Sequence, residues 1–234
     1  MANTPEPRKP RDLILDLLAT RSGMKQDVYA KCKENFALLK QELKALADDL
    51  AAAITLRDPR LKVEFSAQGD FSTKVVVAGD TVVFTMHTNV FRLDQSNSLW
   101  KGSYLQEDEQ RGYFGVVNVY NFLSDSFRYN RERDLGYLVA RLFINREGHF
   151  FVQGKKQLGF LYNDLGKLVM DAGPMRATLE SVLLYVLDFD LLAPPYDQVS
   201  QVTVEEMKQV EANSMVSTGK RLGFRFQADT GEIT

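Results

Sequence analysis

Apolar residues recur at helical spacing through the first quarter of the chain. One stripe predicts a helix that Pro10 can open and Gly23 can close. A longer helix is predicted over residues 25–56, and Asp58-Pro59 ends it because proline disfavours the helical conformation in the residue before it. The first stripe consists of Leu13, Ile14, Leu17 and Leu18.

The longer helix carries apolar residues whose spacing alternates between three and four, which is the a/d pattern of a coiled coil. Two interpretations fit this pattern. Two copies of the chain meet along a homodimer seam, or the helix packs its stripe onto the sheet of its own chain, which suits the bulk of Tyr29 and Phe36. The residues proposed for the seam are Phe36, Leu39, Leu43, Leu46 and Leu50.

After this helix the chain becomes rich in β-branched and aromatic residues, which are typical of strands. Tight turns at Gly79-Asp80 and at 145–148 predict two hairpins, with Gly148 in the left-handed conformation. Hairpins make neighbouring strands antiparallel, and the absence of βαβ alternation argues against a doubly wound nucleotide fold. The predicted strands lie at 63–65, 74–78, 81–91, 113–122, 137–145 and 149–153.

The chain returns to helices towards its end. Gly173-Pro174 opens a helix that is apolar almost all round and reaches about Leu192, so we expect it to be buried. Thr203 and Glu206 form a capping box for a short helix, and a last strand is predicted at 222–226. The predicted class is α+β: an antiparallel sheet flanked by a long N-terminal helix and a buried C-terminal helix. The predicted boundaries are a flexible tail at 1–9, a helical arm at 10–58, the sheet with its C-terminal helices in one compact domain at 59–226, and a flexible tail at 227–234.

Composition narrows the chemistry of the 234 residues. One cysteine, Cys32, excludes an intrachain disulfide and a multi-thiolate metal site, and two histidines leave little for a histidine-built one. The net charge of −2 argues against nucleic acid as a partner, because phosphate contacts need clustered Lys and Arg. No phosphate-binding glycine motif or nucleophile elbow occurs, so we expect no cofactor. The absence of a secretory signal and of a long apolar run predicts a cytoplasmic protein that does not span a membrane.

Polar residues interrupt the predicted strands. In the strand at 81–91, alternation places His87 and Asn89 on the face opposite the apolar one. Asn118 and Arg141 are polar residues within two further strands. If these four residues share one sheet face, they form a ligand site in which His87 exchanges a proton and Arg141 binds an anion. The alternative is a face that water or neighbouring side chains satisfy.

The leading hypothesis is a non-catalytic binding or regulatory module of the cytoplasm. It self-associates as a homodimer through its N-terminal helices and takes a small-molecule or protein ligand. A second hypothesis is a hydrolase-like or metal-dependent enzyme that uses the polar sheet face, although no metal ligands have a recognised spacing and the acidic run 107–109 is typical of a solvated loop. A third is a protein-interaction adaptor that presents Trp100 and Tyr104 from the long connection 92–111.

Overall fold

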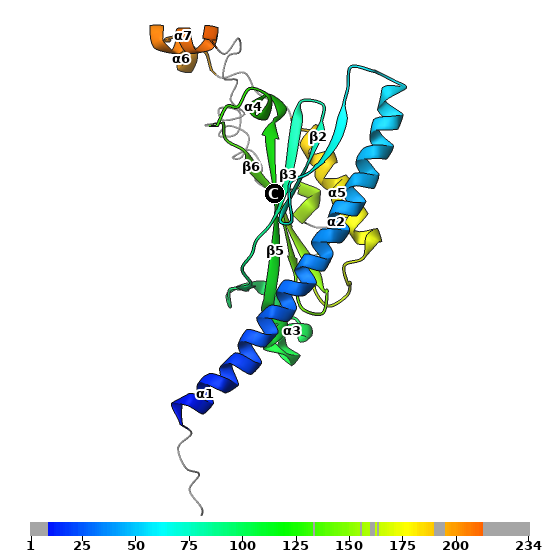
Figure 1. Cartoon of the computed structure of the whole chain (residues 1–234), viewed down its shortest axis with the longest axis vertical. Coiled ribbons are helices and arrows are strands. Elements are labelled where there is room, and N and C mark those ends of the chain that lie inside the picture. Colours follow the sequence, from blue (N-terminus) through cyan, green and yellow to red (C-terminus); the bar gives the residue numbers. More distant parts are fainter. Residues whose placement is uncertain are drawn as a thin grey trace, which may run out of the picture.

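One continuous helical rod opens the chain (Figure 1). The computed structural model describes residues 9–132, 134–154, 156–159, 162, 164–189 and 195–212. Helix α1 (Pro10–Leu17) passes through a π-helical turn (Leu18–Ser22) into α2 (Gly23–Thr55). The predicted break at Gly23 is wrong, because this residue has helical angles (φ −55°, ψ −52°) and the rod continues through it. Apart from Lys9, the predicted tails lie outside the described residues, as does the predicted strand at 222–226.

The sheet is antiparallel throughout, which confirms the predicted α+β class. Its strand order is β1-β2-β3-β5-β6-β7, and the short β4 also pairs with β5. Gly148 adopts the predicted left-handed conformation (φ 82°), whereas the first hairpin turns one residue earlier than predicted, with Ala78 at φ 52°. The bounds are β1 (Val63–Ala67), β2 (Ser72–Val77), β3 (Asp80–Met86), β4 (Phe91–Arg92), β5 (Tyr113–Leu123), β6 (Tyr137–Ile144) and β7 (Phe150–Gly154).

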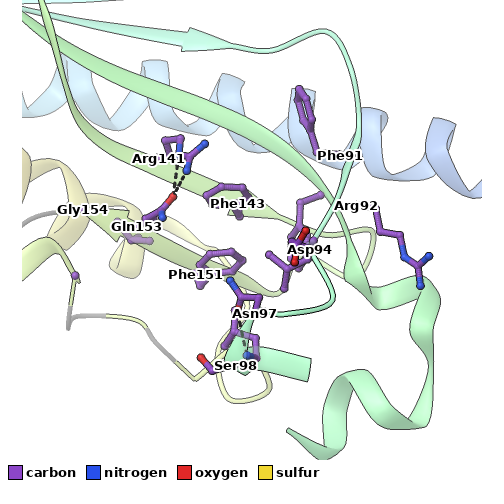
Figure 2. A pocket seen from close by; sticks show the side chains of 15 residues that line it. Phe91, Arg92, Asp94, Asn97, Ser98, Arg141, Phe143, Phe151, Gln153 and Gly154 are labelled. Carbon is purple, nitrogen blue, oxygen red and sulfur yellow. Dashed lines mark hydrogen bonds between the residues drawn. The ribbon is translucent and has the colours of Figure 1, made fainter. Parts of the chain in front are cut away.

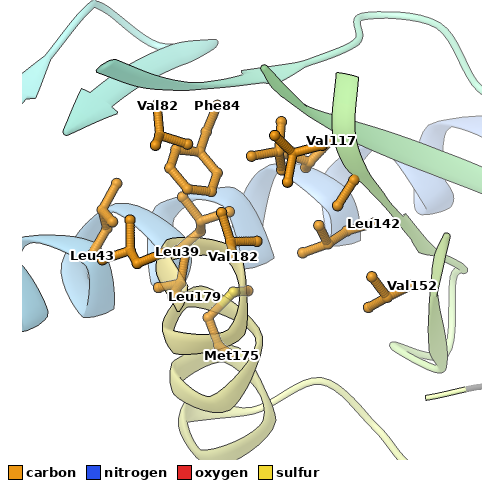
Figure 3. Close-up of a cluster of buried hydrophobic side chains, with 14 of the residues drawn as sticks. Leu39, Leu43, Val82, Phe84, Val117, Leu142, Val152, Met175, Leu179 and Val182 are labelled. Atoms are coloured by element: carbon orange, nitrogen blue, oxygen red, sulfur yellow. The ribbon is translucent and has the colours of Figure 1, made fainter. Parts of the chain in front are cut away.

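The main core lies between one face of the sheet and two helices, α2 and α5 (Ala172–Leu187). Alternate residues of the strands point into it, and Phe84 of β3 packs there with Leu39 of α2 and Leu179 of α5 (Figure 3). Burying apolar side chains of this size contributes roughly 1.5–3 kcal/mol each relative to exposure, so this layer dominates the stability of the fold. The fully buried members include Phe36, Leu39, Leu43, Val75, Val82, Phe84, Val119, Leu142, Met175, Leu179 and Val182.

The a/d stripe of α2 is part of this core, so the structure supports the intramolecular interpretation. Phe36, Leu39, Leu43 and Leu46 are at most 2% exposed in a single chain, and Leu50 packs against the same cluster. The proposed seam through these residues is therefore corrected: the sheet and α5 already cover Phe36, Leu39, Leu43 and Leu46, and Leu50 is half-buried against the same cluster, so no continuous stripe remains for a second copy. A 3–4 spacing arises in both cases, because both bury a narrow stripe of a helix.

The C-terminal helices match the sequence only in part. Asp171 caps α5 by accepting a hydrogen bond from the Gly173 N–H (2.9 Å). The helix is not buried all round, because Leu184 and Leu187 on its outer side are 63% and 52% exposed. The capping box is confirmed where Thr203 and Glu206 exchange hydrogen bonds at the start of α7 (Val204–Ala212), which follows the short α6 (Tyr196–Val199).

The second face of the sheet is covered over β5–β7 by the long connection between β4 and β5. This connection holds α3 (Ser103–Glu107) between two 3₁₀ turns, Ser98–Lys101 and Glu109–Gly112. Its apolar residues join Phe114 and Phe151 in a second, smaller cluster, while the short α4 (Ser124–Arg128) follows β5. Where the connection leaves the sheet uncovered, polar side chains remain accessible.

Candidate functional site

A row of polar residues crosses the second face of the sheet. The strand register pairs Thr85 with Asn118, Asn118 with Arg141, and Arg141 with Gln153. Successive partners on neighbouring strands point to the same side, so the structure brings two of the predicted site residues, Asn118 and Arg141, next to each other. Thr85, Asn118 and Arg141 are half-buried, and Gln153 at the edge of the row is exposed.

The pocket of interest begins at Arg141 and Gln153. It is an open cavity of about 610 Å³ between strands β6–β7 and the segment 91–99 that follows the end of β3. Figure 2 shows Arg141 and Gln153 on one side, with Asp94, Asn97 and Ser98 on the other. The size is within the ordinary range of small-molecule sites.

Three phenylalanines form the floor of this pocket. The rings of Phe143 and Phe151 are cross-strand partners that stack in parallel, with centroids 4.5 Å apart and an interplanar angle of 3°. Phe114 meets both rings edge-on, at 6.1 Å and 5.4 Å. Phe143 is half-buried while Phe151 and Phe114 are buried, so Phe143 supplies most of the aromatic surface that the floor exposes.

Arg141 has an unusual set of partners for an arginine within a strand. Its Nε donates to Oε1 of Gln153 (2.9 Å), its Nη2 donates to the same oxygen, and the guanidinium lies 5.3 Å from the centre of the Phe143 ring. No carboxylate of the described residues lies within 4.0 Å of it. The positive charge is thus oriented by a neutral amide and an aromatic face, and no carboxylate in the described part of the chain neutralises it.

Of the four predicted site residues, only Arg141 lines the pocket: Asn118 adjoins it on β5, and His87 and Asn89 lie beside the pocket. Strand β3 ends at Met86, so the predicted alternation does not extend to His87 and Asn89, which are both exposed. His87 accepts a hydrogen bond from the Asn89 N–H at Nδ1 (3.0 Å), and its ring contacts that of Phe91, a pocket residue, at 4.7 Å. His87 therefore supports the wall of the pocket through Phe91.

The long connection is fixed to the β6–β7 hairpin by a polar network. Tyr104 donates to Glu147 (2.7 Å) and accepts from the buried Asn145 (2.8 Å), while Arg111 pairs with Glu147 (3.1 Å). Burial raises the pKa of Tyr104, and the hydrogen bonds from Tyr104 and Arg111 outweigh burial in lowering the pKa of Glu147. Because Glu147 stays ionised and Tyr104 protonated, this network serves as an anchor that sets the position of the pocket's outer wall.

The aromatic and acidic residues of the connection are also engaged within the chain. Trp100 donates from its indole to the backbone oxygen of Asp94 (2.9 Å) and packs in the smaller cluster, which argues against a role as an exposed adaptor residue. Each acid of the run 107–109 pairs with an arginine: Glu107 with Arg111, Asp108 with Arg146 and Glu109 with Arg92. These ion pairs account for the acidic run without a ligand.

On the core side of the sheet, the thiol of Cys32 is unreactive. Cys32 is fully buried, and burial raises the pKa of its thiol to about 12, so a thiolate does not form near neutral pH. Among the described residues no group of three or more His, Cys, Asp and Glu side chains is placed to hold a metal ion. In the same part of the chain, no helix combines the length and apolar character needed to cross a bilayer.

Comparison of the chain with protein-family models, curated proteins and solved structures gives no significant match. The functional argument therefore rests on the pocket itself. The sequence pointed to one of its polar groups, Arg141, because an arginine within a strand needs a partner. It did not indicate the aromatic floor, since Phe114, Phe143 and Phe151 resemble ordinary core residues until the register shows them on the second face.

Proposed function

We propose that the protein is a non-catalytic binding or regulatory module of the cytoplasm, with its ligand site on the second face of the sheet. The observation that carries the proposal is a pocket of about 610 Å³ in which the guanidinium of Arg141, ion-paired with no carboxylate of the described residues, stands beside the half-buried ring of Phe143. An apolar surface with a few oriented polar groups is the usual composition of a small-molecule site. The ion-paired loop 107–111 and the capped β6–β7 hairpin hold its walls in place.

Titration with 2-naphthalenemethanol, a flat neutral molecule, tests this site by backbone amide NMR. We expect the largest chemical-shift changes in segments 91–99 and 141–154. Phe143→Ala removes half of the stacked pair and should weaken binding about tenfold, since base-like stacking on an aromatic side chain contributes roughly 1–3 kcal/mol. The matched control is Leu138→Ala, an exposed residue of the same strand that does not line the pocket. Shifts centred elsewhere, or equal loss in both variants, would overturn the proposal.

We further propose that the module self-associates through α1 and not through the a/d stripe of α2. Among the described residues nothing buries α1 where the rod extends beyond the sheet (Figure 1), and Leu13, Ile14, Leu17 and Leu18 are each 45–56% exposed. Exposed apolar stripes of this kind are characteristic of interaction surfaces. The charges of residues 10–22 cancel, two arginines (Arg11, Arg21) against two aspartates (Asp12, Asp16), so a second copy meets no net repulsion and an anionic membrane offers little attraction.

Sedimentation velocity over a range of concentrations tests this association. The native chain should form a dimer at high concentration, and Leu17→Lys should abolish it without changing the circular dichroism. Leu56→Lys, placed at the opposite end of the same rod and 89% exposed in a single chain, is the control and should leave the dimer intact. A native chain that stays monomeric at every concentration would refute self-association.

A further inference from the structure

One end of the pocket carries the positive charge of Arg141, and the other end contains the carboxylate of Asp94. Arg141 and Gln153 form one end, and Figure 2 shows Asp94 across the Phe143 and Phe151 rings from them. We infer that the pocket takes a flat molecule that carries a single carboxylate, most simply an aromatic carboxylate. This inference rests on the proposed function and names the ligand class of the same site.

The guanidinium of Arg141 has donor groups left for such an anion. Its Nε and Nη2 donate to one amide oxygen of Gln153, and its Nη1 makes no hydrogen bond with the described residues. Gln153 fixes the orientation of the guanidinium plane without cancelling its charge. Arg141 is also half-buried, so water competes less well with a ligand for its free N–H groups. A planar guanidinium with free, pre-oriented N–H groups is the preferred partner of a carboxylate.

The remaining charges do not offer a second anion site. Arg92 is already bound by Glu109 (3.1 Å) and stacks over Trp100 (5.7 Å). Asp94 accepts two hydrogen bonds from Ser96, and these hold its pKa below the ordinary value, so it is ionised at neutral pH. A ligand with a second negative charge near Asp94 would be repelled, which restricts the class to one anionic group.

The floor favours a flat body next to that carboxylate. Phe143 and Phe151 form a parallel stack at 4.5 Å that Phe114 supports edge-on, and Phe143, the half-buried member, is the ring that a planar ligand would contact. Offset stacking on such a surface adds to the burial of apolar area. The guanidinium lies 5.3 Å from the centre of the Phe143 ring, so a ring on this floor places its substituent close to Arg141.

Isothermal titration calorimetry with two probes of matched shape tests the inference. 2-Naphthoate carries the carboxylate, and 2-naphthalenemethanol replaces it with a neutral group of similar size. We expect the native chain to bind 2-naphthoate at least about tenfold more tightly, because hydrogen bonds to a charged group contribute more than neutral ones. Arg141→Gln should remove this preference and leave binding of 2-naphthalenemethanol within about twofold. Arg92→Gln, on the same pocket but already ion-paired, is the control and should retain the preference.

The outcomes separate the ligand class from the proposed function. If both probes bind the native chain equally, the site stands and the carboxylate preference is refuted. If Arg92→Gln abolishes the preference and Arg141→Gln does not, the assignment of the anion contact to Arg141 is refuted. If neither probe binds at the pocket, the proposed function fails and the inference fails with it.

Discussion

At position 115 the sheet approaches α2 so closely that a side chain does not fit. A Cβ at Gly115 would lie 2.3 Å from Cβ and 2.5 Å from Sγ of Cys32. Gly115→Ala therefore forces β5 and α2 apart, and we expect it to lower the free energy of unfolding by about 1–3 kcal/mol, the usual range for overpacking. Urea denaturation followed by circular dichroism measures this loss. Gly79→Ala is the control, because nothing lies within 4 Å of its Cβ position, and equal values for the two variants would contradict the packing described here.

Individual site residues were predictable where their chemistry conflicts with a strand. Arg141 and Asn118 stand out because polar groups inside a strand need partners, and they do lie side by side. His87 and Asn89 were placed by extending an alternating pattern past the end of β3, where the chain bends away. The His87 N–H still donates to the Val116 carbonyl of β5 (2.8 Å), but the chain bends at Thr88 and Asn89, and no side-chain pattern records that limit.

The joint between α1 and α2 provides an element-scale prediction. Gly23 lies within a continuous helix, and nothing lies within 4 Å of its Cβ position. Gly23→Ala should therefore raise the free energy of unfolding by about 0.5–1 kcal/mol, because alanine loses less backbone freedom in a helix. Gly148→Ala is the counterpart. Because Gly148 has φ 82°, this substitution should lower the free energy of unfolding. If both variants melt at a lower temperature than the native chain, the helix is interrupted at Gly23 as the sequence predicted.

Strand positions followed from the sequence better than strand faces did. A register shift between Val119 and Tyr120 pairs Val119 with Ala140 but Tyr120 with Leu138, so Val139 has no partner of its own. Val139 is consequently buried in the main core, whereas simple alternation assigns it to the face of Arg141. A bulge of this kind depends on the geometry of two strands at once, which a single strand's pattern does not contain.

At the scale of the whole molecule, the order of helix, antiparallel sheet and helix was predictable, because the spacing of apolar residues that distinguishes a helix from a strand is a local property of each segment. The choice between a dimer seam and an intramolecular stripe was not, since it depends on which surface covers the stripe of α2. The structure provides that surface: apolar residues from β2, β3, β5, β6 and β7, together with α5, fill the main core. The same consideration applies to the pocket, which exists because the connection 91–112 covers only part of the second face.

Buried groups that must stay protonated make the whole fold sensitive to alkaline pH. Burial raises the pKa of the Cys32 thiol from 9.0 to about 12, and burial also raises the pKa of Tyr104, Tyr137 and Tyr162 above 10.0. Between pH 9 and 12 the unfolded chain releases the thiol proton while the folded chain retains it. Stability must therefore fall as pH rises, by up to about 1.4 kcal/mol per pH unit for one proton.

Cys32→Ala isolates the contribution of the thiol to this decline. Urea denaturation at a series of pH values should give a shallower fall for the variant, beginning near pH 9, where the tyrosines are still largely protonated in the unfolded chain. The variant also loses some packing, but that loss shifts its curve by a constant amount and does not alter the slope. Parallel curves for the native chain and Cys32→Ala would show that the thiol is accessible in the folded state, and the close contact of α2 with β5 at Gly115 would then be wrong as well.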